Sequence, residues 1–177
     1  MLIPEIDSLT GRAPEEDALA AKSRVVLVLG TNLSEDKDMG DSIKLSQPFN
    51  SVEAAVKAGF KAIMADNNKQ ETEEFGFWVV IKPAKDKKTP QFHFTEPVGG
   101  GSGEVSQVLP VGQAVIANCH THPKRISTGN FSTGDKSSFV KLRQARTGIS
   151  FFLLNPQSEI RRAGQEKDFP AGIPVPW

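Results

Sequence analysis

The sequence contains no tyrosine, only one cysteine and no long run of apolar residues. Cys119 cannot form a disulfide within the chain, and a zinc site built from four cysteines is excluded. The longest apolar run near the start, residues 25–29, is far shorter than the roughly 20 residues that span a bilayer. Acidic residues precede this run, where a signal peptide would be basic. We therefore expect no membrane span, and a protein that is cytoplasmic or secreted without a cleaved signal peptide.

The chain also lacks an excess of charge of either sign, since 21 basic residues balance 21 acidic ones. Domains that bind nucleic acid usually carry a clear basic excess. Residues 124–146 are locally basic, but they contain few aromatic side chains that could stack on bases. We therefore expect no nucleic-acid partner. At 177 residues, of which 38% are hydrophobic, the chain can bury a core without help from a metal ion or a disulfide.

A change in charge composition indicates a boundary between two parts of the chain near residue 47. Residues 1–46 are acidic and contain one apolar run, which predicts an N-terminal extension with a single strand over residues 24–29. Consecutive branched apolar side chains favour burial on both faces, so we expect this strand to add to the main sheet. Residues 47–177 predict one further domain.

Two segments, residues 51–66 and 133–146, have the period of an amphipathic helix. Asn50 is the expected N-cap of the first helix, with Glu53 as its reciprocal partner. Gly148 is the expected C-terminal stop of the second helix. The apolar side chains expected to face inward are Val52, Ala55, Val56, Gly59, Phe60, Ile63 and Met64 in the first helix, and Phe139, Val140, Leu142 and Ala145 in the second.

Other segments alternate with the period of a strand. Strands are predicted over residues 75–81, 91–95, 105–109, 113–119, 149–154 and 159–162. A turn is expected at residues 85–88, a flexible loop at the glycine-rich residues 99–103, and a loop in the last eight residues, which hold three prolines. The order of helices and strands predicts an α+β fold with a mixed, mostly antiparallel sheet flanked by helices.

Two of the three histidines, His120 and His122, lie at the end of a predicted strand. Alternate residues of a strand project to the same face, so both imidazoles could bind one metal ion. Asp135, in the pattern Ser132-x-x-Asp135 at the start of the second helix, could be a third ligand. The same pattern is typical of a helix capping box, and the two histidines could instead be half-buried and bonded to the backbone.

Two other chemistries are less well supported. Residues 129–137 differ from a phosphate-binding P-loop because Asp135 precedes Lys136, and a carboxylate would repel phosphate. Cys119 and His120 are adjacent in a strand and face opposite sides, so they cannot form a thiol–imidazole pair. Cys119 is expected to be buried and structural, and His93 to lie on the solvent side of its strand.

The pattern His120-x-His122-Pro123 followed by Ser132-x-x-Asp135 resembles the JAMM motif of the JAB/MPN-type metallopeptidases. The resemblance covers about residues 47–165 and includes residues 50–55 and 74–76. It extends to a branch of largely unassigned function found at the C-termini of RHS-repeat polymorphic toxins. It implies a JAB/MPN, cytidine-deaminase-like architecture for residues 47–177.

The resemblance also implies the roles of individual residues. His120, His122 and Asp135 would bind Zn²⁺, Glu74 would be the catalytic base, and Ser132 would stabilise the oxyanion. The residues alone do not distinguish Glu74 from Glu71 and Glu73.

The implied activity is zinc-dependent hydrolysis of a peptide or isopeptide bond, in a toxin or effector used in bacterial competition. The implied partners are a protein or peptide substrate and an immunity protein or secretion-system carrier. The alternative is a non-catalytic MPN-like protein-binding module with a structural or vestigial metal site.

Overall fold

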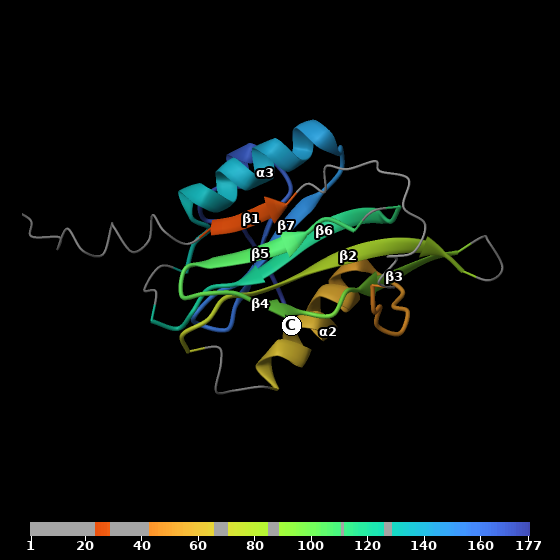
Figure 1. Ribbon diagram of the computed structural model, residues 1–177, viewed down its shortest axis with the longest axis horizontal. Coiled ribbons are helices and arrows are strands. Elements are labelled where there is room, and N and C mark those ends of the chain that lie inside the picture. The colour runs from red at the N-terminus through yellow and green to blue at the C-terminus, as the bar shows by residue number, and fades with distance from the viewer. Residues whose placement is uncertain (1–23, 29–42, 66–70, 85–88, 111, 126–128) are drawn as a thin grey trace, which may run out of the picture.

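The computed structural model describes residues 24–28, 43–65, 71–84, 89–110, 112–125 and 129–177 (Figure 1). The helices are α2 (Val52–Met64), α3 (Thr133–Ala145) and the short 3-10 helix η1 (Glu166–Asp168). The strands are β1 (Arg24–Val28), β2 (Phe75–Pro83), β3 (Pro90–Phe94), β4 (Val98–Gly99), β5 (Glu104–Val108), β6 (Ala114–Thr121), β7 (Ser150–Leu154), β8 (Ile160–Ala163) and β9 (Ile173–Val175).

The main sheet has seven strands, in the order β3-β2-β6-β7-β8-β9 with β4 paired to β2. All neighbours are antiparallel except β6 and β7, which run parallel. A parallel pair needs a long crossover connection, and here α3 lies within it. The crossover brings the start of α3 back towards the end of β6. The predicted fold class, α+β with a mixed, mostly antiparallel sheet flanked by helices, is confirmed.

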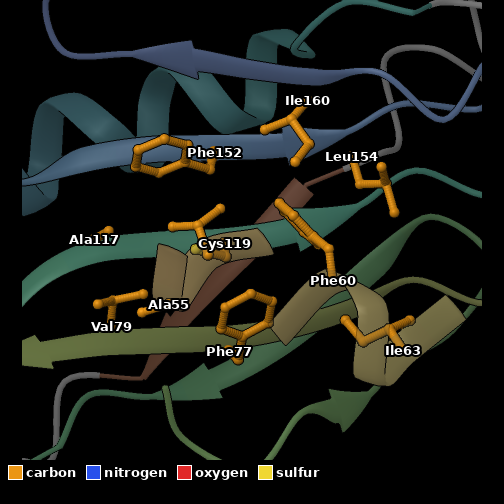
Figure 2. Close-up of a cluster of buried hydrophobic side chains, with 11 residues drawn as sticks. Ala55, Phe60, Ile63, Phe77, Val79, Ala117, Cys119, Phe152, Leu154 and Ile160 are labelled. Carbon is orange, nitrogen blue, oxygen red and sulfur yellow. The ribbon is translucent and has the colours of Figure 1, made fainter. Parts of the chain in front are cut away.

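Helix α2 covers one face of this sheet. Figure 2 shows its Phe60 and Ile63 over Phe77 and Cys119 of the strands. The buried residues of this layer are Ala55, Val56, Phe60, Ile63, Phe77, Val79, Ala117, Cys119, Phe152, Leu154 and Ile160. The predicted inward stripe of α2 is therefore confirmed at its centre.

The N-cap of α2 is Ser51, so the prediction of Asn50 is wrong. Ser51 has an extended backbone conformation, and its hydroxyl accepts a hydrogen bond from the Ala54 N–H at 3.1 Å. The helix begins at Val52. Asn50 is therefore one residue too far away to cap the backbone N–H groups of the first turn, which have no partner within the helix.

Helix α3 and a separate two-stranded sheet, β1–β5, cover the opposite face (Figure 1). Phe139 and Leu142 of α3 belong to the same buried cluster as Trp78, Phe151 and Leu153 of the main sheet. The Trp78 indole N–H donates to the Val108 carbonyl at 2.9 Å and joins β5 to this face.

The predicted strand in the N-terminal extension is present as β1, but its expected place in the main sheet is wrong. It runs parallel to β5, from the pair Arg24 and Glu104 to the pair Val28 and Val108, and its backbone also lies beside α3. The central strands of the main sheet already have neighbours on both sides, whereas β5 offers an edge on the second layer.

The division near residue 47 stays a prediction. Residues just before and after it run beside β3, where the Ser46 N–H donates to the Phe94 carbonyl at 2.9 Å and the Phe49 N–H donates to the Phe92 carbonyl at 2.8 Å.

The glycine-rich segment and the C-terminus are more regular than expected. Within residues 98–101, β4 pairs with β2, and Gly101 bridges to Glu104. A Cβ at Gly100 would lie 2.1 Å from the Glu104 carbonyl oxygen, so this close approach requires glycine. The expected C-terminal loop instead contains β9, an edge strand, where proline is tolerated.

The turn expected at residues 85–88 lies outside the described residues. Among the helices that the structure describes, none is long and apolar enough to cross a membrane.

Candidate metal centre

His120 and His122 lie at the C-terminal end of β6, and the predicted same-face geometry is confirmed. The strand extends through Thr121, and the His122 N–H donates to the Leu154 carbonyl of β7 at 3.1 Å, which continues the pairing by one residue. The two imidazole ring centroids are 5.3 Å apart. Both side chains lie on the face that α3 covers, because each contacts Asp135 of that helix.

Asp135 lies in the first turn of α3 and completes the cluster. Its Oδ1 is 3.2 Å from His120 Nε2, and its Oδ2 is 3.3 Å from His122 Nε2. One potential ligand atom from each of the three residues lies within 4.8 Å of the others. Atoms bound tetrahedrally to zinc at 2.0–2.2 Å are about 3.3–3.6 Å apart. The separations between the ligand atoms here are close to these values. Two imidazoles and a carboxylate therefore fit a bound divalent metal ion such as zinc.

Ser132 holds the Asp135 carboxylate in place through a capping box. The Ser132 N–H and hydroxyl both donate to Asp135 Oδ2, at 2.7 and 2.9 Å, and the Asp135 N–H donates to Ser132 Oγ at 3.0 Å. The capping interpretation of Ser132-x-x-Asp135 is therefore confirmed, and the same residues also build the cluster. The role of Ser132 at an oxyanion stays a prediction.

The cluster is shielded from solvent. The exposed fractions are 0% for His120, 4% for His122 and 0% for Asp135. Burial by itself raises the pKa of the Asp135 carboxyl, but contact with His120, and then with His122, outweighs burial and holds that pKa below its ordinary value. Amides at the start of a helix also favour an anion. Asp135 is thus a carboxylate, the form that binds a metal ion.

Glu74 precedes β2, and β2 pairs with β6. Gly76 lies opposite His120, and the Phe75 N–H donates to Thr121 Oγ1 at 3.0 Å. Continued by two residues, this register sets Glu74 opposite His122 on the same face of the sheet. Glu74 is fully buried, and its backbone bonds to Gly100 and Gly101.

The two other candidate carboxylates are placed differently. The Glu71 side chain is 59% exposed and lies 3.8 Å from Lys124 Nζ in a surface ion pair. Glu73 is half-buried and alternates with Glu74, so it faces the side of the sheet that Phe75 and α2 occupy. The structure thus separates three glutamates that the sequence leaves equivalent.

Sequence reasoning missed several residues around the cluster. Phe131 packs against the His120 ring, with 6.0 Å between the ring centroids. Gln107 of β5 and Asn118 of β6 are buried amides on the same side of the sheet. Alternation offers a signal for Gln107, since it occupies an inward position between the buried Val105 and Leu109.

The two remaining predictions on single residues have different outcomes. Cys119 is completely buried, and burial raises the pKa of its thiol, so the structural interpretation is confirmed. His93 is half-buried rather than solvent-facing, because its Nδ1 lies 2.8 Å from the Ser46 carbonyl oxygen of the segment beside β3.

A groove of about 660 Å³ lies next to the cluster. Gly76, Trp78 and Gln107 are in its lining, together with Thr95, Glu96, Val98 and residues 106–110. The three candidate ligands are not among its lining residues, whereas Gln107 and Gly76, the register partner of His120, are.

Comparisons of the chain with protein-family models, with curated proteins and with solved structures find no match.

Proposed function

We propose that this chain is a zinc-dependent hydrolase of a peptide or isopeptide bond, with a JAB/MPN-type, cytidine-deaminase-like architecture. The observation that carries the proposal is the convergence of His120, His122 and Asp135 in a buried group that could hold a metal ion. Three protein ligands of these types, with one position left open, are typical of catalytic zinc. The extended β2–β6 register, with Glu74 opposite His122, supports a carboxylate beside that group.

The chemistry follows from the roles of these side chains. When bound, zinc supplies Lewis acidity, which polarises a carbonyl group and lowers the pKa of water towards about 7. Glu74 takes the proton from the attacking water on a carboxylate oxygen and then delivers it to the leaving amine. The Ser132 hydroxyl, which has one proton, turns from Asp135 Oδ2 and donates to the developing oxyanion, an interaction worth about 10²–10³ in rate. The Ser132 N–H, which donates to Asp135 Oδ2 at 2.7 Å, keeps the carboxylate oriented.

The resemblance described above also supports a biological role. We propose that the domain is a toxin or effector in bacterial competition that acts on a protein or peptide substrate. An immunity protein and a secretion-system carrier would be its partners.

Hydrolysis by matched variants tests the activity. The zinc-loaded chain is incubated with a panel of quenched fluorescent peptides and lysine-linked isopeptides, and zinc content is measured by elemental mass spectrometry. Glu74→Gln is expected to keep one zinc per chain and lose hydrolysis, since the amide cannot accept a proton. Glu73→Gln is the control, and it is expected to keep both properties because Glu73 faces the other side of the sheet.

Two results would count against the proposal. A fully active Glu74→Gln variant removes this residue from the mechanism. A wild-type chain that binds zinc tightly and cleaves nothing in the panel contradicts the hydrolase and favours the second candidate.

The second candidate is a non-catalytic protein-binding module in which the metal ion is structural. The observation that favours it is the burial of the candidate ligands, of which His120 and Asp135 are 0% and His122 is 4% exposed, so a substrate has little ligand surface to approach. A substrate in the groove would contact Gly76 and Gln107 but none of the three candidate ligands, which do not line the groove. Structural zinc contributes directly to folding, so here removing zinc would lower the free energy of unfolding without loss of any enzymatic activity.

A further inference from the structure

Gln107 is a polar side chain at a position where the fold otherwise buries apolar ones. It lies on β5, and only 1% of its surface is exposed. The residues at neighbouring inward positions, Val105 and Leu109, are apolar and buried. A buried amide at such a position is costly unless its donors and acceptor have partners.

The Gln107 amide lies directly over the pairing of β2 with β6. A Cβ at Gly76 would lie 2.2 Å from Gln107 Nε2 and 2.5 Å from its Cδ, so the amide fills the space that a side chain at Gly76 would take. Gly76 is the register partner of His120. Gln107 Nε2 also donates to the Cys119 carbonyl at 3.4 Å, which belongs to the peptide bond that joins Cys119 to His120. Two independent contacts thus place this amide beside His120.

The Gln107 amide and the His120 ring both have buried polar atoms that make no hydrogen bond with the described residues. These atoms are Gln107 Oε1, an acceptor, and both ring nitrogens of His120, of which Nδ1 is the one without an ion-pair contact. His120 Nε2 faces the Asp135 carboxylate at 3.2 Å, so Nε2 is the nitrogen on the metal side. When Nε2 binds a metal ion, the neutral ring carries its proton on Nδ1, which then requires an acceptor.

We propose that Gln107 is a positioning residue for the metal centre: once the metal ion binds, its Oε1 accepts the Nδ1–H of His120, directly or through one water molecule, a bond that the two atoms do not make in the structure described here. This bond fixes the tautomer in which Nε2 binds the metal ion. The inference rests on the proposed metal site. It accounts for glycine at position 76, because the Gln107 amide occupies that space beside His120. It also explains a buried glutamine in an otherwise apolar layer.

Asn118 is the other buried amide on this side of the sheet, and its side-chain atoms also make no hydrogen bond within the described residues. It precedes His120 by two residues on the same strand, so the two side chains stand side by side roughly 6.6 Å apart along β6. Its shorter side chain points away from the sheet in parallel with the imidazole. Gln107 approaches from the opposing layer, which favours it as the acceptor.

Three variants of the full chain test the assignment: Gln107→Leu removes the acceptor, Gln107→Glu keeps one, and Asn118→Leu is the matched control. Zinc affinity is measured by competition with a chelator, and stability of the metal-free protein by urea unfolding. Gln107→Leu is expected to weaken zinc binding about 10–100-fold, the range typical for partners of metal-binding histidines, while metal-free stability is unchanged or higher. Gln107→Glu and Asn118→Leu are expected to bind zinc within a few-fold of the wild type.

A spectroscopic readout separates positioning from simple packing. In the zinc-loaded wild type, a slowly exchanging His120 Nδ1 proton is expected in the NMR spectrum, and it should be lost in Gln107→Leu. Wild-type zinc affinity in Gln107→Leu, or the same loss in Asn118→Leu, overturns the assignment while the metal site stands. A wild-type chain that binds no zinc overturns the metal site and this inference together.

Discussion

Ser132 and Asp135 hold each other by three hydrogen bonds, and the carboxylate oxygen that receives two of them also faces His122. One interaction therefore serves both the start of α3 and the orientation of a candidate ligand. The two effects can be separated by comparing the caps of the two helices.

Ser132→Ala is expected to lower the free energy of unfolding by about 1 kcal/mol and also to weaken zinc binding, because Asp135 loses the hydroxyl that orients it. Ser51→Ala is the control, since the Ser51 hydroxyl caps α2 with a single bond to the Ala54 N–H. It should cost about the same stability and leave zinc affinity unchanged. Urea unfolding and chelator competition measure the two quantities. Equal zinc affinity in both variants would show that the cap does not orient the ligand.

Replacing one histidine at a time tests the ligand set. His122→Ala is expected to lose bound zinc, and His93→Ala to keep it, because His93 bonds to the Ser46 carbonyl away from the cluster. Elemental mass spectrometry of the purified chains gives the zinc content. Zinc retained in His122→Ala, or lost in His93→Ala, contradicts the assigned ligands.

Zinc is expected to stabilise the wild-type fold, because the metal ion binds the three ligands where the folded chain brings them together and not where the unfolded chain separates them. At a free zinc concentration 100 times Kd, the free energy of unfolding should rise by about 2.7 kcal/mol. Thermal unfolding with and without zinc measures the shift, and His122→Ala should show none. A shift of the same size in His122→Ala would mean that zinc acts elsewhere on the chain.

Gly59 lies where α2 contacts Phe77, and this contact predicts an unusual helix substitution. Alanine normally favours a helix over glycine by about 1 kcal/mol. A Cβ at Gly59 would lie 2.4 Å from Phe77 Cζ, however, and overpacking costs about 1–3 kcal/mol. Gly59→Ala should therefore be destabilising in urea unfolding. Gly101→Ala, where a Cβ meets nothing within 4 Å, should change stability by less than about 0.5 kcal/mol. A stabilised Gly59→Ala would refute this packing.

Cys119 is expected to resist thiol reagents in the folded chain. Burial raises the pKa of its thiol and keeps it protonated, whereas the unfolded thiol ionises near pH 8.5. The stability that this group contributes is thus complete below that pH and is lost as the pH rises towards the folded-state pKa. A colorimetric disulfide reagent should modify one thiol per chain in urea and none in buffer. Rapid reaction in buffer would show that the α2 layer opens readily.

Local sequence patterns predicted most of the fold. Alternation located β2, β3, β5, β6, β7 and β8, but not the short strands β4 and β9. The same rule placed His120 and His122 on one face, because that relation depends only on their separation along one strand. The Ser132-x-x-Asp135 pattern likewise acts within one helical turn. Each of these features is local, and the structure contains each of them.

Other features depend on partners far away in the chain. The edge offered by β5 decides where β1 pairs, and β8 holds Ile173 to Val175 extended in spite of Pro174. Whether Ser51 or Asn50 is the N-cap of α2 depends on the residue at which the helix begins. Glu74 differs from Glu73 only through the register of β2 against β6. Local propensity carries no information on such pairings.

The burial of the candidate ligands has a kinetic consequence. With His120 and Asp135 sealed beneath α3, β5 and the sheet, a metal ion reaches them only when this packing opens for a moment. The rate of uptake should then level off as the zinc concentration rises, since opening and not diffusion limits it. Removal of zinc by a chelator should be limited by the same opening step, so its rate should be independent of chelator concentration. A chain that binds zinc while it folds would thus keep the ion in the presence of chelators that remove zinc from exposed sites.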